Sequence, residues 1–262
     1  MSIELFLLSF PIWFLALIFV GGSMLVAGCL TRLVTHRIPF HIHIENNILA
    51  GYIYQAMVGL FTVLLAFVIM IVWQDFTKAK ESVEQEADHL EIIYYVADGL
   101  PEPQHSEFKE TLISYTESVI DQEWPLMAQG KRSDQAGIFL RKMLNVSLSL
   151  DTQSYHEAIV LQKLGDELSA ISTLRQKRLS DSRSCVEPAL WIMLCSGGFA
   201  LVGFALTFRS RNDRIQILMT MGLAGLISFA LLLVLVLDLP FSGDIHVSNE
   251  VFVQLLSLLK SP

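Results

Sequence analysis

Four stretches of the chain contain no Asp, Glu, Lys or Arg: residues 5–31, 46–74, 188–208 and 215–237. An α-helix needs about 20 apolar residues to cross roughly 30 Å of hydrocarbon, so each stretch is long enough for one crossing. Lipid offers no partners to backbone N–H and C=O groups, so each crossing segment is expected to satisfy these groups within one helix. The sequence therefore predicts an all-α membrane protein with four transmembrane helices.

The charged side chains are concentrated in a polar insert between the second and third stretches. Residues 75–187 contain 12 Lys or Arg and 20 Asp or Glu, which accounts for the whole formal net charge of −8. Binding to nucleic acid requires a basic surface. An insert this acidic predicts that nucleic acid is not a partner.

We expect the second span to continue into the insert as one helix, because no Gly or Pro lies between Gly59 and Gly99. A helix from about Leu49 to Asp98 would be about 75 Å long. Its polar half carries apolar residues at alternating intervals of four and three, the pattern of a helix that packs along another helix. We call these residues the helix seam: Val83, Ala87, Leu90 and Tyr94.

Three more helices are expected in the insert, over residues 104–123, 133–144 and from 151 or 152 to 187. The last of them should run into the third span at Pro188. Residues 75–187 are thus predicted to form a helical domain that continues both the second and the third span. Residues 238–262, after the last span, are expected to form a C-terminal interfacial tail.

The second span also carries a row of small and mildly polar residues, which we call the small-residue stripe: Gln55, Gly59, Thr62 and Ala66. Two interpretations are open. Small residues allow close packing of helices in lipid, and channels line their pores with small and apolar surfaces. Ionisable side chains, which ion-coupled pumps usually keep inside the membrane, are absent from all four spans.

Metal and catalytic signals are weak. His41, His43 and Glu45 alternate with isoleucines and would share one side of an extended segment, where they could meet a metal. The simpler interpretation is an interfacial segment whose polar tips reach the headgroups. The insert has no recognised nucleophile, zinc-protease or phosphate-loop motif. We therefore expect neither a metal nor another cofactor, and we do not expect an enzyme.

Several segments carry a family resemblance in chain order: Glu86-Ala87, residues 97–103, Tyr115, residues 123–130, Arg175 to Leu179, Pro188, Trp191, residues 237–243 and Val247-Ser248. In these segments the chain resembles the bestrophin-like family, a mainly bacterial group of membrane proteins. It departs from the family at Lys78 and Lys80, where arginines are usual, and at Leu239, where Arg is frequent.

The family is remotely similar to bestrophins, which are pentameric anion channels with four membrane helices and a cytoplasmic helical body. The resemblance implies a multi-pass homo-oligomer of the cell inner membrane whose second span lines a pore. It favours a channel-like protein that passes ions, anions among them, or small solutes passively. The alternative is a non-conducting membrane scaffold or sensor whose helical domain recruits a partner. Basic residues at both membrane ends leave the side that holds the insert open.

Overall fold

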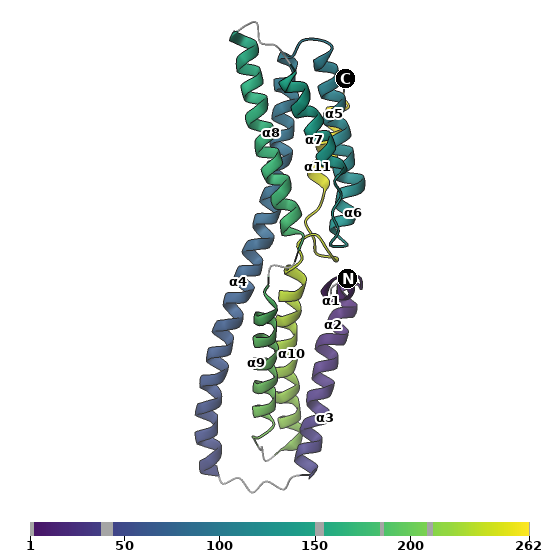
Figure 1. The fold of residues 1–262 in the computed structure, drawn as a ribbon. Helices are drawn as coiled ribbons and strands as arrows, with labels where there is room; N and C mark the ends of the chain where they lie inside the picture. Colours follow the sequence, from purple (N-terminus) through teal and green to yellow (C-terminus); the bar gives the residue numbers. More distant parts are fainter. Residues whose placement is uncertain (1–2, 38–43, 150–154, 184–185, 209–211, 262) are drawn as a thin grey trace. The chain divides into compact units, whose positions relative to one another are not determined.

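The computed structural model describes residues 3–37, 44–149, 155–183, 186–208 and 212–261. Within these ranges the chain is helical and contains no strand, which confirms the predicted all-α class (Figure 1). The α-helices are α1 (Ile3–Leu7), α2 (Ile12–Ala16), α3 (Gly22–Arg37), α4 (Ile44–Val96), α5 (Gln104–Ser118), α6 (Trp124–Met127), α7 (Gln135–Leu148), α8 (Tyr155–Asp181), α9 (Pro188–Ala205), α10 (Asp213–Leu237) and α11 (Glu250–Leu259). Short π-helical segments join α2 to α3 (Leu17–Gly21) and α5 to α6 (Val119–Glu123), and a 3-10 turn (Ala97–Gly99) follows α4.

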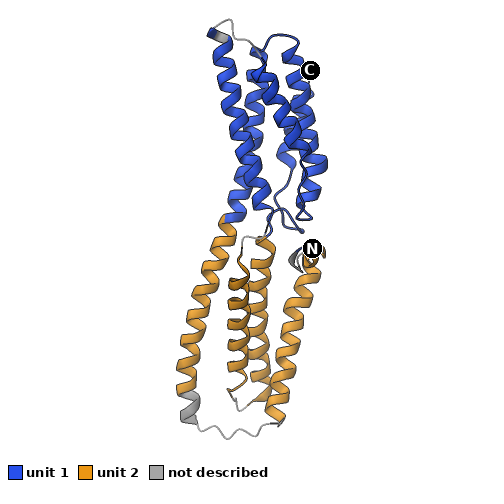
Figure 2. Ribbon diagram, in the orientation of Figure 1, with its two compact units in different colours: residues 1–5, 75–183, 239–262 blue, residues 6–74, 184–238 orange. Residues whose placement is uncertain are grey.

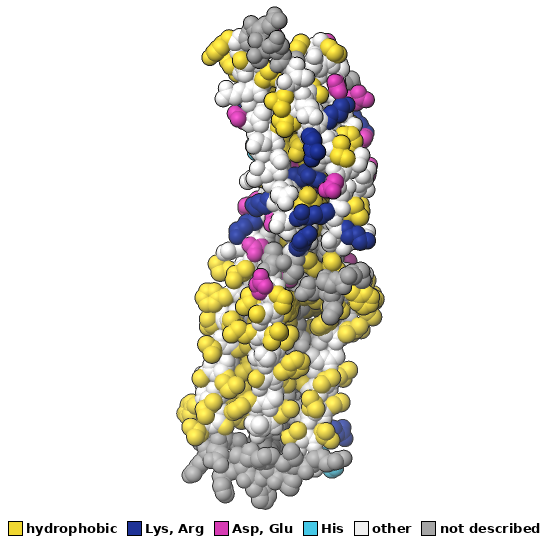
Figure 3. All heavy atoms as spheres, in the orientation of Figure 1, with side chains coloured by type: hydrophobic (Ala, Val, Ile, Leu, Met, Phe, Trp, Pro, Cys, Tyr) yellow, Lys and Arg dark blue, Asp and Glu magenta, His cyan; other side chains and the backbone are white. Residues whose placement is uncertain are grey.

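The chain divides into two compact units, which Figure 2 colours separately. Unit 1 comprises Met1–Leu5, Asp75–Arg183 and Leu239–Pro262, and unit 2 comprises Phe6–Gln74 and Ser184–Asp238. Unit 2 contains the apolar parts of four helices that are long and apolar enough to cross a membrane. In Figure 3, hydrophobic side chains dominate its visible surface, whereas charged side chains gather on unit 1. The prediction of four membrane-spanning helices is therefore confirmed.

The first span differs from its predicted bounds. It begins at Ile12 instead of residue 5, because the backbone is broken between α1 and α2 and restarts after Pro11. Proline has no N–H to donate to a preceding turn, but its carbonyl can accept the first hydrogen bonds of a new helix. The Pro11 carbonyl accepts the N–H groups of Phe14 and Leu15. At its other end, α3 continues through Arg32 to Arg37.

Within unit 2, the apolar half of α4 packs against α9 at a glycine. A Cβ atom added at Gly197 would lie 2.8 Å from two ring carbons of Phe61, so the absence of a side chain allows the Phe61 ring to lie on α9. Small residues permit this close approach between helices in lipid. The neighbouring Gly198 is buried, whereas Gly203 on the same helix is exposed, with no atom near its Cβ position.

We expect Gly197→Val to destabilise unit 2, because the new side chain would collide with the Phe61 ring. Overpacking of this kind typically costs about 1–3 kcal/mol. Gly203→Val is the matched control, since it introduces the same side chain on α9 where nothing lies within 4 Å. Thermal unfolding of both purified proteins in one detergent tests the expectation. Equal melting temperatures would show that the contact between Phe61 and Gly197 contributes nothing.

Unit 1 is built on the polar half of α4. The helix runs unbroken from Ile44 to Val96, as the lack of Gly and Pro predicted. It packs with α5, α7, α8 and α11 around one hydrophobic core. The helix predicted over 104–123 continues as the π segment and α6 to Met127, beyond Pro125, and turns at Gly130, where φ is 67°. The helix predicted over 133–144 is α7.

The last helix of the insert does not continue into the third span, so that part of the prediction is wrong. It is described from Tyr155, its predicted start at 151 or 152 lying outside the described residues, and it ends at Asp181. Helix α9 is a new helix that begins at Pro188, because proline has no N–H to donate to a preceding turn. Just before it, the Val186 N–H donates to the buried Asp238 carboxylate at 2.8 Å.

In the segment expected to form an interfacial tail, the structure describes residues 238–261, and the apolar residues of its helix α11 pack against protein. Phe252, Leu255 and Leu259 of α11 are buried in the core of unit 1, and so are Phe241 and Val247 before it. The apolar face of α11 is covered by protein, because it packs against α5 and the π segment that follows. An amphipathic helix therefore completes a core here.

Candidate functional site

The small-residue stripe lies on the part of α4 that belongs to unit 2, and the chain's own helices leave it uncovered. Gln55, Gly59, Thr62 and Ala66 are all exposed. A Cβ atom added at Gly59 would meet nothing within 4 Å. The structure thus brings the four predicted residues together on one open face.

The buried residues of this part of α4 are Phe61, Val68 and Val72. At about 100° per residue, they fall on the side of the helix largely opposite the stripe. Gln55 has no hydrogen-bond partner among the described residues, although its amide has two donors and an acceptor. Leaving such a group unpaired in hydrocarbon costs roughly 2–7 kcal/mol, so this face requires water or another protein.

The helix seam lies further along α4, within unit 1. Val83, Ala87 and Leu90 are buried, with exposed fractions of at most 3%. Tyr94 is partly buried, and the Lys109 ammonium lies 4.2 Å from the centre of its ring.

The weak metal candidates fall outside the part of the chain whose side chains the structure describes. His41 and His43 lie outside the described residues, and the side chain of Glu45 is likewise not described. Among the residues that are described, no group of three or more His, Cys, Asp or Glu side chains is placed to hold a metal ion.

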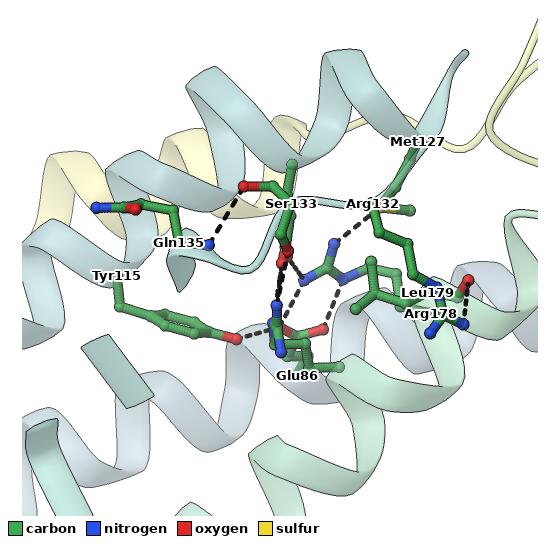
Figure 4. Close-up of polar contacts among 10 residues, drawn as sticks. Glu86, Tyr115, Met127, Arg132, Ser133, Gln135, Arg178 and Leu179 are labelled. Carbon is green, nitrogen blue, oxygen red and sulfur yellow. Dashed lines mark hydrogen bonds and ion pairs between the residues drawn. The ribbon is translucent and has the colours of Figure 1, made fainter. Parts of the chain in front are cut away.

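Sequence reasoning missed an ion network inside unit 1 (Figure 4). Arg178 of α8 is fully buried between two buried glutamates. Its Nε and Nη2 donate to Glu86 at 2.8 and 3.1 Å, and Nη2 also donates to Glu123 at 2.9 Å. Arg175 donates from Nε to the other oxygen of Glu123 at 3.0 Å. The Tyr115 hydroxyl donates to Glu86 at 2.7 Å, so the network joins α4, α5, the π segment after α5, and α8.

The charges of this network balance, with two arginines facing two glutamates. Burial by itself would lower the pKa of Arg178, but the charge and hydrogen bonds of Glu86, together with the charge of Glu123, raise it above its ordinary value. Burial, followed by the charge of Glu86, raises the pKa of Tyr115, which therefore remains a neutral donor. Met127 and the Trp124 ring complete the surroundings of the Arg178 guanidinium.

We infer a structural role for this network. Desolvation of buried ion pairs offsets much of their attraction, but removal of one partner leaves an uncompensated charge. The arrangement therefore selects one register of α4 against α8. The signal in the sequence was the spacing. Glu86 follows Val83 by three residues, and Arg175 and Arg178 continue the spacing of Leu168 and Ile171 on α8, so these charges occupy core positions of apolar rows.

Segments that are far apart in the sequence meet around this network. The Trp124 ring lies 5.6 Å from both Phe241 and Phe252, and the Ser242 hydroxyl donates to the Ala128 carbonyl at 3.0 Å. Part of the resemblance thus lies in one packed core of unit 1, which includes Ala87, Tyr115, Trp124, Phe241 and Val247.

Comparison with known proteins gives the same fold. The Bestrophin-like domain model matches residues 16–252. No curated protein matches the chain. Two point-mutant crystal structures of a bacterial bestrophin homolog from Klebsiella pneumoniae align with TM-scores of 0.69 and 0.68 at 11% and 12% identity. The first alignment covers 92% of this chain and 97% of the homolog's chain, and the second covers 90% and 96% respectively. A crystal structure described as a membrane protein aligns with a TM-score of 0.69 at 11% identity, over 92% of this chain and 99% of its own.

Proposed function

Because the chain belongs to the Bestrophin-like family, we propose that it is a homo-oligomeric, channel-like protein of the cell inner membrane. It passes ions, anions among them, or small solutes passively. Unit 1 serves assembly or gating.

The observation that carries the proposal is the uncovered small-residue stripe on α4. A membrane helix with Gln55 and Thr62 on its open face is poorly suited to lipid, because both side chains need hydrogen-bond partners. Copies arranged around a closed symmetry axis would turn this face towards a shared water-filled path. The stripe contains no charge, so it would offer a passing ion no tight binding site.

The remainder of the apolar part of α4 supports oligomer formation. Leu60, Phe67 and Trp73 are 77%, 61% and 58% exposed, so large apolar side chains also remain uncovered elsewhere on this part of α4. Lipid tails or neighbouring copies would cover these side chains. Neither contact with lipid nor close packing of helices explains why the stripe carries an amide and a hydroxyl.

Electrical recording of the purified protein in planar bilayers tests the proposal. We expect discrete conductance steps, and replacement of chloride by gluconate will show from the shift in reversal potential whether anions carry the current. Light scattering of the same preparation should give the mass of a closed oligomer. An intact oligomer without conductance in any salt would contradict the proposal and favour the non-conducting scaffold or sensor.

A further inference from the structure

A groove with a cavity volume of about 430 Å³ lies between α7 and α8 in unit 1. Leu140 and Leu168 are buried and form its base, while Arg141, Ser169 and Ser172 are exposed and form its rim. Its volume falls within the range of small-molecule sites, about 300–1,000 Å³.

Two glycines widen this groove. A Cβ atom added at Gly165 on α8 would meet nothing within 4 Å. A Cβ atom added at Gly137 on α7 would lie 3.1 Å from Nη1 of Arg175, so the guanidinium lies directly beside that glycine. The open space therefore depends on the absence of two side chains from the facing helices.

The charge of the groove is opposite to that of the insert around it. All charged residues that line it are basic, namely Arg141 and Arg175, although residues 75–187 carry 20 acidic and 12 basic side chains. Basic side chains gather on the face of unit 1 drawn in Figure 3. The groove would thus attract an anion that the rest of the acidic unit repels.

The two arginines have hydrogen-bonding capacity to spare. Arg141 has no ion-pair or hydrogen-bond partner in the part of the chain that the structure describes. Arg175 uses Nε and Nη2 for Glu123 and for the Ser133 carbonyl, while its Nη1 has no described partner. Since Glu123 shares the charge of Arg175, Arg141 supplies the uncompensated positive charge.

We propose that this groove binds a small organic carboxylate. The planar fork of an arginine matches the two oxygens of a carboxylate. Arg141 and Nη1 of Arg175 receive the charged end, with Ser169 and Ser172 as further donors at the rim. The apolar body of the ligand lies on Leu140 and Leu168. The site is separate from the small-residue stripe, and its occupancy does not depend on conduction.

Fluorine NMR of para-fluorobenzoate titrated into the full-length protein in detergent tests the site. We expect saturable line broadening with the wild-type protein. Arg141→Gln should weaken binding by about tenfold, as loss of one charged hydrogen-bonding group does. Gly165→Leu should abolish binding by filling the groove without disturbing the fold, because the space at its Cβ position is open; an unchanged melting temperature would verify this. Lys142→Gln is the matched control, because Lys142 pairs with Glu107 at 3.2 Å and does not line the groove.

Four results would overturn the proposal. The first is the absence of saturable binding to the wild-type protein. The second is an equal loss of affinity in the Lys142 and Arg141 variants, which would show only a general charge effect. The third is displacement of para-fluorobenzoate by inorganic phosphate at equal concentration, which would show that the apolar base recognises nothing. Retained binding in Gly165→Leu would place the ligand elsewhere and would equally reject the groove.

Discussion

The Arg178→Met variant is expected to lose the packed core of unit 1. Methionine keeps much of the side-chain length but leaves Glu86 buried without its cationic partner and removes one of the two arginines that hold Glu123. Breaking a buried ion pair in this way costs about 3–5 kcal/mol, a large share of the stability of a typical domain. Near-ultraviolet circular dichroism will report the loss, because the Arg178 guanidinium lies 5.4 Å from the Trp124 ring.

Two further variants separate charge from packing. Arg132→Met is the matched control, since Arg132 is exposed and donates to the Leu179 carbonyl at 3.5 Å. It should melt close to the wild-type temperature. Adding Glu86→Gln to Arg178→Met should recover part of the lost stability by removing one uncompensated charge. If Arg178→Met and Arg132→Met melt together, the network does not hold unit 1 in its fold.

The Thr62→Trp variant is expected to abolish the proposed conductance. Thr62 lies on the open face of α4, so an oligomer would bring one indole from every copy to the same level of the path. Bulky apolar rings at a constriction exclude water and ions together. Single-channel recording should show current reduced at least about tenfold, while light scattering shows an unchanged oligomer.

Leu60→Trp is the matched control for this experiment. Leu60 is 77% exposed on the same helix, two residues away and thus about 160° around it. The same indole there should leave the current close to wild type. Equal currents in wild type and Thr62→Trp, with the oligomer intact, would exclude the stripe from the path.

The fold was predictable where one physical constraint dominates. A membrane span must avoid charged residues because lipid surrounds it, and the four uncharged stretches correspond to four apolar helices in the structure. The long helix α4 followed from the absence of Gly and Pro. The first span was misplaced because the six apolar or small residues before Pro11 resemble the span itself, and a hydropathy pattern does not reveal that proline lacks an N–H.

Long-range packing was less accessible. Helix α8 ends at Asp181, and a few residues later the Val186 N–H donates to the carboxylate of Asp238. The local sequence does not reveal this contact, because Asp238 is distant along the chain. The apolar face of α11 fits a membrane interface as well as a protein core, and its contacts with α5, the π segment and Trp124 distinguish the two. Glu167 follows the exposed Asp166 directly in the sequence, yet it is buried and held by Lys163 and His89. Charges in register with apolar rows are the signal to look for.

The balanced, buried ion network has a consequence for handling the protein. Mobile counterions weaken charge attraction across water, over about 10 Å at 0.1 M salt, but they reach little of a pair enclosed by protein. Arg178, Glu86 and Glu123 are wholly enclosed. Ionic strength can therefore be varied widely as an experimental variable, and a current that changes with it would reflect the permeating ions and not a melted scaffold.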